Sequence, residues 1–201
     1  MSAMQPQYDP WRQSPDMPLS VGSESEIAAL VFGRNDRPDA LLAAFARKLS
    51  TQGHRVIGFV QRGGCASDML QLVELPGERL HQVATTGPSA HGTAAHDWLR
   101  HSDLITSIVD HATAASLIIL NRYGTLEQQG QGLLLLIEQC ARGGTPLIVA
   151  VAEHRFDHWL HRVRGLGVKL RCRPDDLDRW WHSVTGAETP LTNDTVCATL
   201  K

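Results

Sequence analysis

The stretch "SLIILNRYGTLEQQGQGLLLLI", residues 116 to 137, indicates the fold class. An unbroken apolar run, Leu117 to Leu120, gives way to Asn121-Arg122-Tyr123-Gly124, and a glycine-punctuated segment then leads into a second apolar run. This order is typical of a buried strand that is followed by a helix. Ligands of open α/β sheets bind at the carboxyl ends of strands, so the polar residues stand where a site is expected.

The same alternation of short β-like runs and longer helical runs continues on both sides of this stretch. Because strands that alternate with helices favour parallel pairing, we expect an α/β fold with a mostly parallel sheet and helices on both faces. A β-hairpin joined by Pro76-Gly77 is predicted within it. The predicted strands are 27–33, 54–61, 68–75, 79–86, 116–120, 145–151 and 167–172, and the predicted helices are 38–53, 93–113, 127–142, 155–164 and one opened by Pro174.

Chain length and composition favour one domain with tails. The chain has 201 residues, of which 42% are hydrophobic, enough for one sizeable core over residues 26–186. Residues 1–25 contain four prolines and no signal-like apolar core, so a disordered leader is expected rather than an export signal. Residues 187–201 are polar and are predicted to be a C-terminal tail.

Charge and cysteine usage exclude several classes of partner. Lys and Arg number 19 against 21 Asp and Glu, so no overall field favours nucleic acid. No apolar run approaches the ~20 residues of a spanning helix, so membrane insertion is not expected. The four cysteines are widely spaced without a C-x-x-C pair, which predicts a reduced, cytoplasmic setting.

The segment after the first predicted strand, "FGRNDRPDALL", stands where a phosphate-binding loop would lie. A P-loop needs G-x-x-x-x-G-K-[ST], because glycine N–H groups and lysine hold phosphate and the hydroxyl holds magnesium. Here Gly33 is followed by Pro38, Asp39 and Ala40 at the last three positions, so Walker-type hydrolysis is not expected. Arg34 still suits an anion near the helix N-terminus; the alternative is a solvated loop.

The end of strand 116–120 lacks the acidic pair that organises magnesium in P-loop proteins. Asn121 and Arg122 stand there instead, so the metal loses its protein anchor. Glu127 is either a surviving ligand or a favourable charge in a first helical turn. Gly124 and Gly130 either approach a ligand closely or serve only turns and packing.

The order of these segments resembles a bacterial family of domains of unknown function, over about Ile27 to Trp181. Members are sometimes encoded near molybdenum-handling genes and are described as nucleoside-triphosphatase-like or as part of a molybdenum transporter. The most specific element is N-R-Y-G-x-x-E-x-x-G-x-G-L at 121–133. The layout is in turn similar to small P-loop nucleoside-triphosphatases, which implies a three-layer, P-loop-NTPase-like architecture. Two departures are Thr125, where the family pattern has lysine, and residues 89–98, which replace a cysteine-bearing segment.

Two further groups of side chains are candidates for binding. If strands one, two and 116–120 are parallel neighbours, Arg34, Arg62 and Arg122 share one crevice suited to a phosphate or another oxyanion. The alternative is that these arginines pair with nearby carboxylates. Three histidines at helical spacing are candidates for a transition metal, although a solvated helix face is the simpler and favoured explanation. They are His154, His158 and His161, opposite an apolar face formed by Phe156, Trp159, Leu160 and Val163.

These patterns predict a non-catalytic protein that binds a nucleotide or small oxyanion through a degenerate P-loop. The resemblance adds a molybdenum-related accessory role; no cofactor is specified. The predicted ligand-binding residues are Arg34, Asn35, Arg62, Asn121, Arg122, Gly124, Glu127 and Gly130. One alternative is a divergent nucleoside-triphosphate phosphohydrolase that uses Glu127. Another is an interaction module with a vestigial pocket, which binds a protein partner or a second copy of itself.

Overall fold

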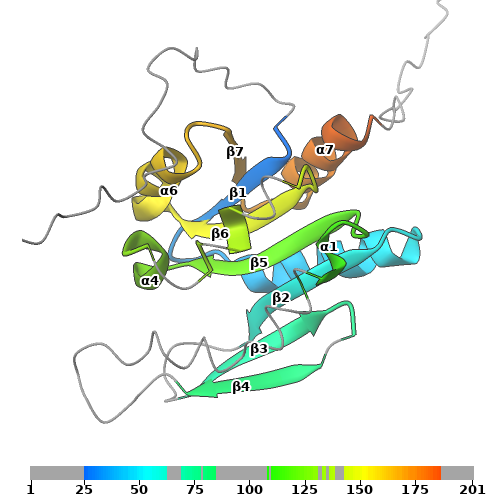
Figure 1. The fold of residues 1–201 in the computed structure, drawn as a ribbon, viewed down its shortest axis with the longest axis horizontal. Coiled ribbons are helices and arrows are strands. Elements are labelled where there is room, and N and C mark those ends of the chain that lie inside the picture. The colour runs from blue at the N-terminus through cyan, green and yellow to red at the C-terminus, as the bar shows by residue number, and fades with distance from the viewer. Residues whose placement is uncertain are drawn as a thin grey trace, which may run out of the picture.

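Within the described part of the chain, seven strands form a mostly parallel sheet at the centre of the molecule (Figure 1). The computed structural model describes residues 25–62, 69–77, 79–84, 108, 110–130, 133–134, 136–138 and 143–186. The strands are β1 (Ile27–Phe32), β2 (Val56–Arg62), β3 (Met69–Leu75), β4 (Leu80–Ala84), β5 (Leu117–Tyr123), β6 (Leu147–Ala152) and β7 (Gly167–Arg171). Their order across the sheet is β4-β3-β2-β5-β6-β1-β7.

Strand direction divides the sheet into two parts. The five strands β2, β5, β6, β1 and β7 are parallel. The hairpin of β3 and β4 adds two antiparallel strands at the β2 edge, and Pro76 and Gly77 follow β3 as predicted. Among the parallel strands, β1 and β6 are continuously apolar because both of their faces are buried.

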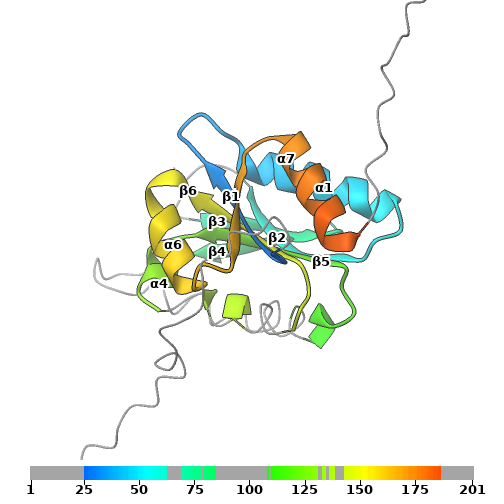
Figure 2. The ribbon, with the colours of Figure 1, turned by 90° about the horizontal axis from the view of Figure 1, so that it is seen from above.

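Helices pack against both faces of the sheet. α1 (Pro38–Thr51) and α7 (Pro174–Thr185) lie together on one face, where Phe45 and Trp180 join its core cluster. The 3-10 helix η1 (Glu153–Arg155) leads into α6 (Phe156–Arg162), whose Trp159 belongs to the cluster on the other face. Figure 2 shows α1 and α7 on one side of the sheet and α6 on the other. The predicted α/β class, with a mostly parallel sheet and helices, is therefore confirmed.

The predicted end of the strand at residue 120 is wrong. β5 continues through Tyr123, with a bulge at Asn121, because Arg122 and Tyr123 pair with Ala150 and Val151 of β6. The following helix, predicted over 127–142, instead begins with the short α4 (Thr125–Gln128), and a turn separates it from the helical residues at 134 and 136–138. The polar residues thus extend the strand rather than ending it.

The prediction that the first strand, the second strand and strand 116–120 are neighbours in the sheet is wrong in part. β2 and β5 are neighbours, but β6 lies between β5 and β1. Most of the predicted helix 93–113, segment 89–98, residues 1–24 and the tail 187–201 lie outside the described residues. Among the described helices, none is long and apolar enough to cross a membrane.

Candidate functional site

The connections of β1 and β6 create a topological switch point. The two strands are parallel neighbours, with Phe32 beside Ala152 at their carboxyl ends. After β1 the chain passes to α1 on one face, whereas after β6 it passes through η1 to α6 on the opposite face (Figure 2). Neighbouring strands whose helices leave to opposite faces open a crevice at their carboxyl ends, where α/β proteins bind ligands.

The loop after β1 lies at the carboxyl end of this strand, at the switch point. Its backbone is closed by an acidic side chain: the Gly33 N–H donates to Asp36 Oδ2 at 2.7 Å, and the Asp36 N–H donates to the Gly33 carbonyl at 3.3 Å. Arg34 and Asn35 at the tip are exposed, without a polar partner within the described part of the chain. A carboxylate of the loop itself therefore occupies a backbone donor that a P-loop would offer to phosphate.

Arg122 reaches the same region from β5. Its Nε donates to Asp39 Oδ1 at 3.2 Å, its Nη2 forms an ion pair with Asp39 Oδ2, and its guanidinium lies 5.2 Å from the centre of the Phe32 ring. Asp39 belongs to the first turn of α1. Of the two alternatives for these arginines, the structure shows pairing with a carboxylate for Arg122. The partner is Asp39, which is distant from Arg122 in the sequence.

Arg62 lies apart from the other two arginines. It is the exposed last residue of β2, and two strands, β5 and β6, separate β2 from β1. Three strand spacings amount to about 14 Å. The structure therefore brings Arg122 to the β1–α1 segment but leaves Arg62 at a distance.

Glu127 organises the backbone after β5. Its buried carboxylate accepts the Gly124 N–H at 2.7 Å and the Leu133 N–H at 3.0 Å, as in a capping box extended to a second donor. Gly130 has a positive φ of 81° and donates its N–H to the Glu127 carbonyl at 3.2 Å. Glu127, Gly124 and Gly130 thus hold one turn together, beginning directly after the strand that carries the Asn121 bulge.

A second polar cluster beside β5 and β6 was missed by sequence reasoning. The Tyr123 hydroxyl lies 2.9 Å from His158 Nδ1, and Arg155 Nη2 donates to Thr125 Oγ1 at 3.2 Å. Burial raises the pKa of Tyr123; Arg162 and Arg155 oppose this shift, and Glu127 reinforces it. The departure from the family pattern at Thr125 was the one sequence signal for this cluster. Its partner, Arg155, lies 30 residues away in the sequence.

The histidines lie on the solvent side of η1 and α6, as predicted. His154, His158 and His161 are exposed, whereas Trp159 is buried and its apolar neighbours pack against the core. His158 contacts Tyr123, and His154 Nε2 accepts from Arg155 Nε at 3.1 Å. Among the described residues, no group of three or more His, Cys, Asp or Glu side chains is arranged to hold a metal ion.

The fold and its switch point define an α/β protein in which the parallel neighbours β1 and β6 lead to helices on opposite faces of the sheet. The chain belongs to the family described as "Protein of unknown function (DUF2478)", which matches residues 27–180. It is also 28% identical over 179 residues to the Molybdenum import ATP-binding protein ModC 2 of Bradyrhizobium diazoefficiens. That match covers 85% of this chain but only 20% of the relative. No solved structure matches.

Proposed function

We propose that this chain binds a nucleotide or a small oxyanion without hydrolysing it, in the crevice between the carboxyl ends of β1 and β6. The observation that carries the proposal is the switch point, because the loops after these parallel neighbours lead to helices on opposite faces. The fold-level part of the proposal is a P-loop-like, three-layer architecture whose phosphate-binding loop is degenerate.

The chemistry of the crevice suits an anion. Arg34 and Asn35 supply exposed donors from the β1–α1 loop, and Arg122 supplies a planar guanidinium once Asp39 is displaced. Guanidinium groups bind phosphate and related oxyanions through paired N–H donors. Arg62 contributes only to a ligand as extended as a nucleotide, because it lies about 14 Å from β1 across three strand spacings.

The proposed lack of catalysis rests on what replaces the hydrolytic groups. The β1–α1 loop has neither the lysine nor the hydroxyl of a P-loop, and Asp36 occupies the Gly33 N–H. Glu127 is buried against two backbone N–H groups, so its carboxylate supports a turn rather than a catalytic water. In this proposal Asn121, Gly124, Glu127 and Gly130 shape the end of β5.

The proposed biological setting is a molybdenum-related accessory role. It is supported by the similarity to a protein named for molybdenum import and ATP binding. Since the match spans a fifth of that protein, its ATP binding and its transport partners do not transfer with the similarity. Molybdate and nucleotides are therefore the first ligands to test.

The test is a thermal-unfolding panel on the purified chain with magnesium-ATP, magnesium-GTP, molybdate, tungstate, sulfate and phosphate. A ligand at ~100 times its dissociation constant adds ~2.7 kcal/mol, which raises the unfolding temperature by several degrees. We expect one nucleotide or oxyanion to raise it, Arg34→Ala and Arg122→Ala to reduce the shift, and Arg79→Ala on the hairpin turn to preserve it. No shift with any of the six ligands, or a shift indifferent to both arginines, would overturn the proposal.

A further inference from the structure

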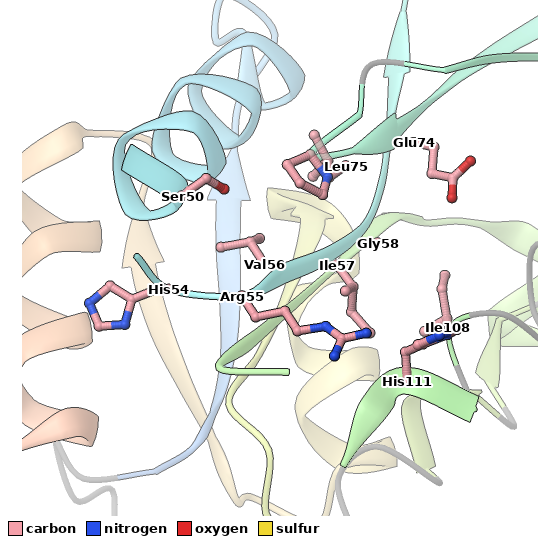
Figure 3. A pocket seen from close by; sticks show the side chains of 11 residues that line it. Ser50, His54, Arg55, Val56, Ile57, Gly58, Glu74, Leu75, Ile108 and His111 are labelled. Carbon is pink, nitrogen blue, oxygen red and sulfur yellow. The ribbon is translucent and has the colours of Figure 1, made fainter. Parts of the chain in front are cut away.

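A cavity of about 360 Å³ lies at the amino-terminal end of β2 (Figure 3). The proposed anion site lies at the opposite, carboxyl ends of the parallel strands. The cavity is formed beside the end of α1, the end of β3 and the helical residues before β5. Its volume falls within the range of ligand pockets, about 300–1,000 Å³. The cavity is separate from the proposed oxyanion site, and forming the hairpin turn does not require it.

The cavity opens where the hairpin stops covering β2. The antiparallel ladder begins at Gly58 opposite Leu75, and the chain then turns away at Pro76. Val56 and Ile57 therefore pair only with β5 among the described strands. On the hairpin side, no described strand pairs with the first two residues of β2, which leave an open edge within the described part of the sheet.

The walls nearest this open edge are apolar. Val56 and Leu75, 0% and 5% exposed, belong to the core cluster on the α1 face. Ile108, 3% exposed, and Ile57 belong to the opposite face, and Pro76 also lines the cavity. An apolar lining with a few polar groups is the usual composition of a small-molecule site. The ligand that fits this part of the cavity has a short hydrocarbon body.

The charges around the cavity favour an anionic end on that ligand. Glu74 Oε2 lies within hydrogen-bonding distance of His81 Nε2, at 2.9 Å, and His54 packs edge-on against Trp181. Arg55 is exposed, and its guanidinium has no partner among the residues that the structure describes. Figure 3 shows its side chain extending toward the side of the cavity where Ile57 and His111 lie.

We propose that this cavity binds an organic carboxylate with a short apolar body. Arg55 takes the carboxylate through charge-assisted hydrogen bonds, and the hydrocarbon packs against Ile57 and Ile108, which lie on the same face of the sheet. Any amide of the ligand hydrogen-bonds the backbone groups of β2 that pair with no described strand. A free short-chain fatty acid and the C-terminal residue of a peptide both carry this chemistry. The site is independent of the proposed oxyanion crevice, because it lies at the other end of the strands.

The probes are hexanoate and hexan-1-ol, with an N-acetylated tripeptide ending in valine as the free acid and as the C-terminal amide. Ligand-observed NMR on the full chain measures each dissociation constant. We expect hexanoate and the peptide acid to bind, and the alcohol and the amide to bind at least roughly tenfold more weakly. Tighter binding of the peptide acid than of hexanoate would identify a chain end as the source; the reverse would identify a free acid.

Arg55→Gln provides the matched test, because it removes only an exposed charge. It should weaken both carboxylates roughly tenfold, whereas Arg79→Gln on the nearby hairpin turn should change neither. Ile57→Asp, on the cavity wall, should also abolish binding, provided that its unfolding transition remains cooperative. Equal binding of hexanoate and hexanol, absence of binding by both acids, or unchanged affinity in Arg55→Gln would overturn the proposal.

Discussion

Asp39, in the first turn of α1, holds the guanidinium of Arg122, at the end of β5, although the two residues are 83 positions apart in the sequence. Arg122 also lies over the ring of Phe32, the last residue of β1. The contact thus ties β5 to the β1–α1 connection across the intervening β6. The carboxylate of Asp39 is therefore already paired with the Arg122 guanidinium that the proposed ligand would bind.

Removing the Asp39 charge should therefore strengthen anion binding. Asp39→Asn leaves the side-chain shape but weakens the pair, and we expect roughly fivefold tighter binding of the active oxyanion or nucleotide, about 1 kcal/mol. Isothermal titration with molybdate and with magnesium-ATP measures the change. Asp178→Asn, which breaks the Lys48–Asp178 pair between α1 and α7, is the charge-matched control and should leave affinity unchanged. Unchanged or weaker binding in Asp39→Asn would remove Arg122 from the anion site.

Glu127 should contribute to stability rather than to chemistry. Glu127→Gln retains one acceptor oxygen for two backbone donors, so one of the N–H groups of Gly124 and Leu133 loses its partner. We expect the free energy of unfolding to fall by about 1–3 kcal/mol, measured by urea denaturation. Glu153→Gln, which is exposed at the start of η1, should stay within about 0.5 kcal/mol of the parent. Magnesium-dependent phosphate release that disappears in Glu127→Gln, with stability unchanged, would instead support the hydrolase alternative.

The local pattern of the sequence predicted the elements well, because burial determines it directly. The continuous apolar runs of β1 and β6 are buried on both faces, and the α6 histidines are exposed opposite Trp159. The hairpin followed from alternation around Pro76-Gly77. In each case the residues that form the pattern are also the residues that make the contacts.

Strand order and the partners of the polar residues could not be predicted in the same way. Nothing local places β6 between β5 and β1, because that order depends on which face each connection crosses. Asn121 and Arg122 read as the end of a strand, yet β6 supplies ladder partners beyond the bulge. The pairing of Arg122 with Asp39 then depends on this order, so the site could be predicted only as a set of candidates.

Gly58 on β2 should be the least replaceable glycine of the described strands. Its φ is +131°, and an added Cβ would lie 1.8 Å from the carbonyl oxygen of Ile119 on β5. Because that contact is with backbone, Gly58→Ala should lower the free energy of unfolding by about 3 kcal/mol or more. Gly53→Ala has a positive φ of +87° but open space, so it should cost only about 1–2 kcal/mol. If both variants lost the same free energy of unfolding, the positive φ alone, and not the close approach of the β5 backbone, would be the reason that glycine is required at position 58.

Asp176, in the first turn of α7, should make stability depend on acid pH. Hydrogen bonds from Arg171, together with the contact to Arg179, lower the pKa of Asp176 from 3.8 to about 2, against the opposing effect of burial. A lowered folded-state pKa means that the stabilisation is complete above the unfolded value and is lost as pH falls from about 4 toward about 2. Both arginines are more than half exposed, at 62% and 66%, so solvent screening limits the effect to about 1 kcal/mol.

Urea denaturation at a series of pH values between about 5 and about 2.5 tests this dependence on the Asp176 carboxylate. Asp176→Asn should be less stable than the parent at the upper end of the series, and the difference should shrink as the parent carboxylate becomes protonated. Asp175→Asn, an exposed neighbour in the same first turn, should follow the parent curve throughout. A difference between Asp176→Asn and the parent that stays constant with pH would assign the role of Asp176 to packing instead of to its charge.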